Sequence, residues 1–321
     1  MASLLERKLI VVTGKGGAGK TTVACALGLI AARSGRRTIV AELGDQHRLP
    51  ALFGHSTPPK SGTELKLEPA LWSTSIDPDE ALFEWLRTLG GRFSVRMLAA
   101  SSTFHYFAAA APGAKELVSM VKVRELCEEQ HKRKRRYDLV VLDAPATGHA
   151  LAMLRSPQTF AAIVRGGPLA EQAQGIQELL AHPRRTGYVA VAQGTEMAVA
   201  ETLELEEGLR RHLDRDLDVV VVNGTVPRRF ALAELERISA ATEDGACAEL
   251  GERAVLARSA GQMARTVHER ARQQQSQIAR LRRQRVAKGS PQALLTIPFT
   301  FTPELDLAAV RDISTRLERK L

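Results

Sequence analysis

Aromatic residues, cysteines and long apolar runs are all scarce in this sequence. Only 4% of its 321 residues are aromatic, and its three cysteines lie far apart without a C-x-x-C pair. Because the histidines also form no cluster at ligand spacing, the sequence argues against a disulfide framework and a structural zinc site. No apolar run reaches the roughly 18 residues of a membrane-spanning helix, and the short run after Lys8 cannot serve as a secretion signal. We therefore expect a cytoplasmic protein.

Basic residues are in excess but unevenly distributed. The chain has 45 Lys+Arg against 36 Asp+Glu, a net charge of +9. Residues 253–288 alone hold ten basic residues and one acid, and residues 131–136 add five basic residues. Nucleic-acid binding needs a basic face on the folded protein rather than a high average charge. We therefore expect no nucleic-acid partner, and the two basic segments favour peripheral membrane contact or an acidic partner. We expect a solvated turn over 131–136. Residues 261–287 predict an amphipathic helix that packs on the protein body and has a basic outer face, because Met263, Val267, Ala271, Ile278 and Leu281 recur at helical spacing.

Short runs of apolar, β-branched residues alternate with helical stretches along the chain. The run 9–13 ends at Gly14, a helical stretch over 20–34 closes at Gly35, and a second run covers 37–41. This spacing is typical of a βαβ unit, whose strands are parallel and buried on both faces. Further strands are expected at 71–76, 137–143, 188–193, 217–223 and 294–298. We predict an α/β protein with one doubly wound, mostly parallel sheet and a single domain over residues 1–321.

Residues 77–136 follow a different pattern, without a convincing strand and rich in Ala, Leu, Phe and Met. Asp77-Pro-Asp-Glu80 is typical of a helix start, with acids in the first turn. We predict a helical subdomain inserted between two strands, with 157–183 packing on it. The region holds much of the scarce aromatic content and many other large apolar residues, namely Phe83, Trp85, Leu86, Leu89, Phe93, Val95, Met97, Leu98, Phe104, Tyr106 and Phe107.

A glycine-rich loop follows the first predicted strand. Gly14-Lys-Gly-Gly-Ala-Gly-Lys-Thr-Thr22 fits the phosphate-loop pattern G-x-x-x-x-G-K-[ST], placed between a strand and a helix as the mechanism requires. The backbone of such a loop curls around the β-phosphate of a nucleotide, while Lys20 neutralises phosphates and the Thr21 hydroxyl binds Mg²⁺. We predict an ATP and Mg²⁺ site at Gly14, Gly16, Gly17, Ala18, Gly19, Lys20, Thr21 and Thr22.

A second lysine, Lys15, stands directly after the first glycine of this loop. It cannot easily reach its own γ-phosphate alongside Lys20. It can instead reach the nucleotide of a partner subunit, where its charge would stabilise the transferred phosphoryl group. The alternative interpretation is that Lys15 is an ordinary loop lysine exposed to solvent, without a role in the partner's site.

The segment K-G-G-x-G-K-T-T resembles the deviant Walker A signature of the MinD/ParA, nitrogenase-reductase and arsenical-pump ATPases, which work as nucleotide-sandwich dimers. The segment Tyr137-Asp-Leu-Val-Val-Leu-Asp-Ala-Pro-Ala-Thr-Gly-His149 is similar to the switch II segment of the arsenical-pump and tail-anchored-protein-targeting ATPases. S-I-D-P-D-E-A-L before Phe83 and the P-G-x-x-E turn ending at Glu116 also resemble that branch. The resemblance implies a dimeric ATPase that uses ATP and Mg²⁺.

Individual residues outside the loop also have predicted roles. Asp143 ends a hydrophobic strand, the position of the Walker B acid that holds a Mg²⁺-bound water. Thr147 and Gly148 would sense the γ-phosphate and pass the signal to the following helix. The resemblance also implies adenine contacts from Asn223, Pro298 and Phe299.

The sequence departs from this family after its second predicted strand. Members carry D-P-A-x-x-L there, with an aspartate that orients the attacking water, whereas this chain has Ala41-Glu-Leu-Gly-Asp45. Either Asp45, which we take as the catalytic candidate, or Glu42 substitutes for that acid, or neither does. A similar segment occurs in actinobacterial-type anion-transporting ATPases encoded beside a paralogue that keeps D-P-A. We therefore expect a heterodimer with such a paralogue, with a homodimer as the alternative.

The cargo is not evident from the sequence. Cys25, Cys127 and Cys247 do not match the arsenite-binding cysteines of the pump ATPases, and the zinc-binding C-x-x-C of the targeting ATPases is missing. The apolar residues of the helical subdomain, followed by the polar-poor stretch 100–111, are either ordinary core or a groove for a hydrophobic helix or lipid-like client. Two other functions stay open: a nucleotide-gated scaffold with little turnover, and a ParA-like partitioning switch.

Overall fold

The computed structural model describes residues 4–44, 47–57, 59–89, 113–131, 134–163, 168–242, 253–290, 293–302 and 304–321. An eight-stranded sheet forms the centre, in the order β10-β9-β8-β1-β7-β2-β4-β3. The strands are β1 (Leu9–Gly14), β2 (Thr38–Leu43), β3 (Leu65–Glu68), β4 (Leu71–Ile76), β7 (Leu139–Ala146), β8 (Thr186–Ala192), β9 (Val219–Thr225) and β10 (Leu294–Pro298). Every neighbouring pair is parallel except β3 and β4.

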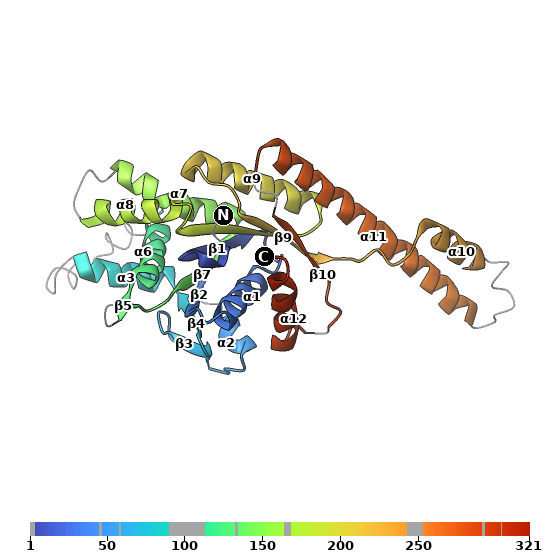
Figure 1. Ribbon diagram of the computed structural model, residues 1–321, viewed down its shortest axis with the longest axis horizontal. Helices are drawn as coiled ribbons and strands as arrows, with labels where there is room; N and C mark the ends of the chain where they lie inside the picture. Colours follow the sequence, from blue (N-terminus) through green and yellow to red (C-terminus); the bar gives the residue numbers. More distant parts are fainter. Residues whose placement is uncertain are drawn as a thin grey trace, which may run out of the picture.

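Helices cover both faces of this sheet (Figure 1). They are the 3₁₀ turn η1 (Leu4–Glu6) and helices α1 (Lys20–Arg33), α2 (Arg48–Leu52), α3 (Pro78–Leu89), α6 (Ala114–Glu128), α7 (Thr147–Ile163), α8 (Pro168–Ala181), α9 (Glu196–Leu213), α10 (Leu232–Thr242), α11 (Arg253–Ala287) and α12 (Leu307–Glu318). The predicted α/β class and the doubly wound parallel sheet are confirmed. The edge strand β3 is absent from the sequence prediction, because it is four residues long and none of its side chains is fully buried.

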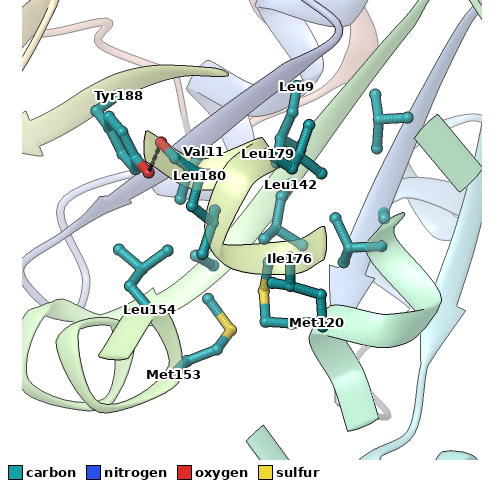
Figure 2. Close-up of a cluster of buried hydrophobic side chains, with 14 of the residues drawn as sticks. Leu9, Val11, Met120, Leu142, Met153, Leu154, Ile176, Leu179, Leu180 and Tyr188 are labelled. Atoms are coloured by element: carbon teal, nitrogen blue, oxygen red, sulfur yellow. Dashed lines mark hydrogen bonds between the residues drawn. The ribbon is translucent and has the colours of Figure 1, made fainter. Parts of the chain in front are cut away.

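Two hydrophobic cores, one on each face of the sheet, explain why the strands are apolar on both sides. All six residues of β1 are buried, with Leu9 and Val11 in one core and Ile10 and Val12 in the other. The first core is closed by α6, α7, α8 and α9, as Figure 2 shows for Met120, Met153 and Ile176. The second core lies beneath α1 and α12.

The region between β4 and β7 contains α3 and α6. The predicted start of α3 is confirmed, because Asp77 Oδ1 accepts hydrogen bonds from the backbone N–H groups of Asp79 and Glu80, each at 2.8 Å. α8 packs against α6 and α7. Residues 90–112, which include Phe93 to Phe107 of the apolar set, lie outside the described residues. The division into a domain and a helical insertion therefore stays a prediction.

Two expectations about the basic segments need correction. The sequence predicts a turn over 131–136, but Gln130–His131 (β5) pairs antiparallel with Lys134–Arg135 (β6) in a small hairpin. It also predicts a basic helix over 261–287 with Met263 on its inner face, whereas α11 begins at Arg253 and Met263 is 66% exposed. The reason is that α11 extends beyond the sheet, so its first half packs against α10 rather than against the body (Figure 1).

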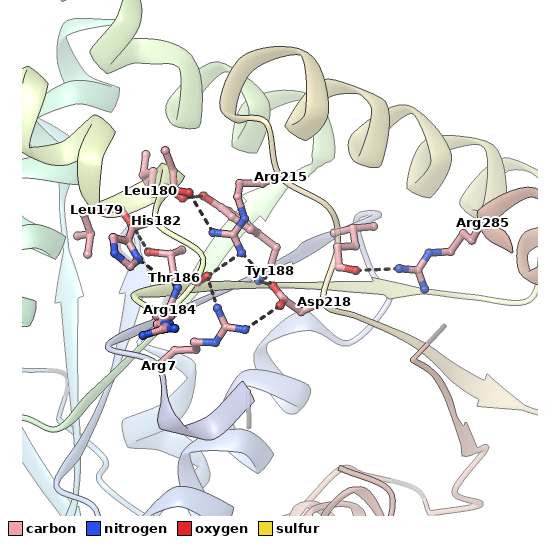
Figure 3. Close-up of polar contacts among 12 residues, drawn as sticks. Arg7, Leu179, Leu180, His182, Arg184, Thr186, Tyr188, Arg215, Asp218 and Arg285 are labelled. Carbon is pink, nitrogen blue, oxygen red and sulfur yellow. Dashed lines mark hydrogen bonds and ion pairs between the residues drawn. The ribbon is translucent and has the colours of Figure 1, made fainter. Parts of the chain in front are cut away.

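Polar contacts join the strands at the amino end of the sheet, opposite the P-loop edge (Figure 3). Asp218 accepts a hydrogen bond from Tyr188 N at 2.9 Å and pairs with the guanidinium groups of Arg7, at 3.3 Å, and Arg215, at 3.5 Å. Both arginines also donate to Thr186 O.

Among the described residues, no helix combines the length and apolar character that crossing a membrane requires.

Candidate functional site

The P-loop connects the carboxyl end of β1 to the amino end of α1. Gly17 and Gly19 have φ of +74° and +92°, which side chains other than glycine rarely adopt. A Cβ on Gly19 would also lie 2.4 Å from Asn223 Nδ2, whereas one on Gly16 would meet nothing within 4 Å. Gly19 caps α1 without a side-chain hydrogen bond. The first N–H groups of α1 therefore point toward the loop, an arrangement that binds anions.

Lys20 is the first residue of α1 and its side chain returns over the loop. Its Nζ donates a hydrogen bond to Lys15 O at 3.3 Å. Burial lowers the pKa of Lys20, the nearby Asp143 carboxylate raises it, and the positive charge of Arg48 lowers it further. A cation that is partly removed from water in this way is suited to neutralise phosphate.

Thr21 and Asp143 meet at the centre of the site. Thr21 Oγ1 donates a hydrogen bond to Asp143 Oδ2 at 2.6 Å, while Asp143 Oδ1 is buried and has no hydrogen-bond partner. Burial raises the pKa of the Asp143 carboxyl, while the hydrogen bond from Thr21 and the charge of Lys20 lower it and offset part of this increase. The free oxygen beside a hydroxyl fits Mg²⁺, which keeps several waters and takes few protein ligands. No cluster of three or more His, Cys, Asp or Glu residues suited to another metal occurs in the described part of the chain.

Lys15 is paired with an acidic residue of α9. Its Nζ pairs with the Glu201 carboxylate of α9, and both side chains are about one-quarter to one-third exposed. The structure therefore holds the second loop lysine against α9, a partner that no sequence pattern indicates. Glu201 lies 186 residues further along the chain, so only the packing of α9 beside β1 brings the two together.

Asn223 lies in the last part of β9, and Phe299 follows the end of β10. Asn223 Nδ2 donates a hydrogen bond to Ala18 O at 2.9 Å. Phe299 N donates to Thr225 O at 2.9 Å, and the Phe299 ring is 49% exposed and edge-on to Phe301. Pro298 ends β10 directly before this ring. Asn223 therefore contacts the loop directly, whereas Pro298 and Phe299 are joined to β9, and contact of the three residues with adenine stays a prediction.

Glu42, one of the two candidate acids after β2, is engaged by the backbone. It is only 3% exposed, and its carboxylate accepts backbone hydrogen bonds from Arg48, at 2.9 Å, and Leu49, at 3.3 Å. It holds the first turn of α2 instead of facing open space. Asp45, the other candidate, lies outside the described residues.

The predicted switch residues after β7 differ in their surroundings. Gly148 is exposed, while Thr147 begins α7 and its Oγ1 is buried without a hydrogen-bond partner. Their response to the γ-phosphate stays a prediction.

A cavity of about 800 Å³ joins Lys20, Thr21 and Asp143, whereas Lys15, Glu42, Thr147, Gly148, Asn223, Pro298 and Phe299 do not line it. Its lining combines the P-loop with the ends of β2 and β7, helix α2 and Leu305, namely Gly16, Gly17, Gly19, Lys20, Thr21, Thr22, Leu43, Arg48, Ala51, Leu52, Asp143, Ala144, Pro145, Ala146 and Leu305. The sequence did not predict Arg48, Ala51, Leu52 and Leu305, because no local pattern marks them. The arrangement can bind a polyphosphate together with a divalent cation.

Comparison with known proteins adds an independent observation. The family model described as anion-transporting ATPase matches residues 7–166, a range that includes the P-loop and Asp143. The chain is 30% identical over 241 residues to the ATPase BagA of Mycobacterium tuberculosis, covering 72% of this chain and 68% of the relative. It is 28% identical over 254 residues to the ATPase ASNA1 homolog of Dictyostelium discoideum, covering 68% of this chain and 72% of the relative. It is 31% identical over 153 residues to ATPase ASNA1 homolog 1 of Paramecium tetraurelia, covering 47% and 44%.

Proposed function

The chain belongs to the anion-transporting ATPase family and is an ATPase, and we propose that it works as a Mg²⁺-ATP-dependent dimer whose subunits close and open during the nucleotide cycle. The observation that carries this proposal is the pair formed by Thr21 and Asp143 beside the P-loop, with one carboxylate oxygen free. ATP and Mg²⁺ are the cofactors that this donor set suits best.

Each residue has a defined task in this proposal. The P-loop amides and Lys20 would hold the phosphates, and Thr21 and Asp143 would hold the metal and its water. Mg²⁺, when bound, neutralises charge on the phosphate oxygens. Asp45 orients the attacking water, because the carboxylate of Glu42 is already engaged by the backbone of α2. Asn223, Pro298 and Phe299 form the adenine side of the site.

Lys15 acts in the partner subunit in this proposal. The contact with Glu201 keeps the Lys15 ammonium group away from its own site and leaves it near the loop surface. On closure, Lys15 leaves or shares Glu201 and reaches the nucleotide of the other subunit. The partner is a paralogue that retains the D-P-A segment, or a second copy of this chain.

The cargo proposal rests on the helical region between β4 and β7. Phe83 of α3 is 44% exposed in this region, and a separate cavity of about 630 Å³ lies between α3, α6, α8 and the sheet. Its described lining mixes apolar side chains such as Val121 and Ile176 with charged ones such as Glu84 and Lys122. We propose a hydrophobic helix or a lipid-like ligand as the client, or an anion transporter as the partner, in a cytoplasmic protein that contacts membranes only peripherally.

A complementation experiment tests the catalytic part of the proposal. Lys20→Ala and Lys15→Ala should each lower steady-state ATP hydrolysis by about a hundredfold or more, while Lys15→Ala keeps its affinity for ATP. Mixing the two variants should restore hydrolysis if two copies pair, since each supplies what the other lacks. If the pairing is with the paralogue, hydrolysis should return only when the paralogue is added. A chain that stays monomeric at saturating ATP and hydrolyses it at full rate would contradict the dimer.

A second candidate function is a nucleotide-gated binding subunit with little turnover of its own. It is favoured by the geometry of Glu42, which caps α2 and so cannot orient a water. In that case ATP binding would change the dimer affinity, measured by light scattering, while hydrolysis by this chain stays at background even with the paralogue present.

A further inference from the structure

The departure from D-P-A after β2 builds a small structural unit of its own. Glu42, near the end of β2, accepts the backbone N–H groups of Arg48 and Leu49 with a carboxylate that is almost completely buried. These bonds fix where α2 begins and therefore where the Arg48 side chain leaves the backbone. Leu49 and Pro50, the next two residues of α2, are buried. The start of α2 is thus held from two sides.

Arg48 is exposed and lines the same cavity as the P-loop. Its guanidinium group makes no hydrogen bond or ion pair within the described residues. Lys20 and Asp143 line this cavity together with Arg48, so the Arg48 guanidinium group shares one space with both charged groups. Two cations that face one cavity repel each other unless an anion lies between them, so the arrangement calls for a polyanion.

The sheet register places Arg48 on the metal side of that cavity. Glu42 and Asp143 are direct neighbours on the parallel strands β2 and β7. The segment that follows Glu42 therefore leaves the sheet beside Asp143, across the cavity from the P-loop. In a bound nucleoside triphosphate the P-loop surrounds the inner phosphates, and the terminal phosphate lies toward the metal carboxylate. An arginine at this place is suited to that phosphate, because it stays charged and offers several fixed donors.

We propose that Arg48 binds the terminal phosphate of the nucleotide and makes this site distinguish a nucleoside triphosphate from a diphosphate, with Glu42 as its positioning residue. This inference rests on the proposed ATP site. The proposal also gives Glu42 a role although its carboxylate does not line the cavity. That carboxylate holds the start of α2, and α2 carries Arg48.

Titration calorimetry with a non-hydrolysable ATP analogue and with ADP, both with Mg²⁺, tests the role of Arg48. Arg48→Gln should weaken binding of the ATP analogue about tenfold or more and change ADP affinity less than about threefold, because one charge-assisted contact is lost only with the terminal phosphate. Arg48→Lys should bind the ATP analogue with an affinity between that of the unaltered chain and that of Arg48→Gln. Arg272→Gln, a change at an exposed arginine of α11, is the matched control and should alter neither affinity.

Glu42 is tested by the ratio of the two affinities, which a merely structural role would leave unchanged. Glu42→Ala should reduce the preference for the ATP analogue, and Glu42→Gln should retain more of it, since the amide oxygen still accepts from α2. Equal losses for both nucleotides in Arg48→Gln, or no loss at all, would overturn the proposal while leaving the ATP site intact. If the unaltered chain binds neither nucleotide, the proposed function and this inference both fail.

Discussion

Gly19 illustrates how single residues of the P-loop are constrained by the strands around it. Its φ is left-handed, and a Cβ on this residue would lie 2.4 Å from Asn223 Nδ2, so a larger residue here would both strain the backbone and displace the Asn223 side chain. Gly16, only three residues earlier, has open space at the same position. The two glycines therefore look alike in the sequence but differ in what they tolerate.

We predict that Gly19→Ala lowers stability without nucleotide by about 1–3 kcal/mol, because it adds backbone strain and displaces Asn223. Thermal unfolding monitored by circular dichroism should show a midpoint lower by roughly 2–10 °C. Gly16→Ala is the control and should unfold at the original temperature. An equal decrease for both variants would mean that the approach of Asn223 does not matter.

Cys25 gives a second prediction at this scale. The thiol is completely buried in α1, and burial together with nearby carboxylates raises its pKa from 9.0 to about 12. Below pH 9 the thiol is protonated in both folded and unfolded protein. Between pH 9 and about 12 only the unfolded thiol ionises, so this group lowers stability across that window.

At pH 8 the folded protein should therefore hold about a thousandfold less Cys25 thiolate than an ordinary cysteine would. Iodoacetamide labelling followed by peptide mass spectrometry should leave Cys25 unmodified, whereas labelling in denaturant should modify it fully. Rapid labelling of Cys25 in the folded protein would show that α1 opens locally or that the thiol is less buried.

At the scale of elements, a buried ion pair joins the carboxyl end of α11 to the body. Arg285 and Glu206 of α9 are 2% and 1% exposed, with the guanidinium group 3.2 Å from the carboxylate. The same guanidinium donates to Leu217 O at 2.8 Å and Ala293 O at 3.3 Å. These contacts join the carboxyl end of α11 to α9 and to the starts of β9 and β10. The long helix can project from the sheet because this end is anchored.

We predict that Arg285→Met destabilises the protein by about 3–5 kcal/mol, because it leaves the Glu206 carboxylate buried without a partner. Arg285→Met combined with Glu206→Leu should recover much of the loss, since neither charge then remains. Arg316→Gln, which breaks an exposed pair with Asp312, should cost less than about 0.5 kcal/mol. Urea unfolding of the four proteins measures these differences, and a small effect of Arg285→Met alone would contradict the anchor.

At the scale of the whole molecule, the basic segments lie apart. The hairpin β5–β6 lies at one end of the protein and α11 extends from the other (Figure 1). A net charge of +9 is therefore not gathered on one face. Binding to nucleic acid depends on many phosphate contacts made together, so the separation weakens it.

We predict that double-stranded DNA binds only weakly at about 0.15 M salt, a concentration at which counterions compete strongly with scattered basic residues. Fluorescence anisotropy over a salt series, with ADP and with a non-hydrolysable ATP analogue, measures this directly. The protein should release DNA at physiological salt with either nucleotide. Tight binding that depends on the nucleotide would favour a partitioning switch on DNA.

The sequence by itself determined the elements whose signals are local. The strands β1, β2, β4 and β10, the P-loop, and the cap of α3 by Asp77 all depend on residues within a few positions of each other, so pattern and turn chemistry were sufficient. The match of the P-loop to a nucleotide site also needed no distant residue. Met263 was misplaced because periodicity shows that a helix has an apolar face but not what covers it.

Only the tertiary structure decided how distant segments meet at the site. From the sequence alone, the Glu42 carboxylate could either face the cavity or bond to the backbone. In the structure it accepts a hydrogen bond from the backbone N–H of Arg48, because α2 begins beside it. Lys15 meets Glu201, and Asn223 meets Ala18, across 186 and 205 residues of sequence. Such contacts arise because parallel strands bring their carboxyl ends to one edge of the sheet, whatever their order in the chain. The sequence by itself therefore predicts a phosphate site at the P-loop, and the fold decided which further residues face the cavity beside that loop.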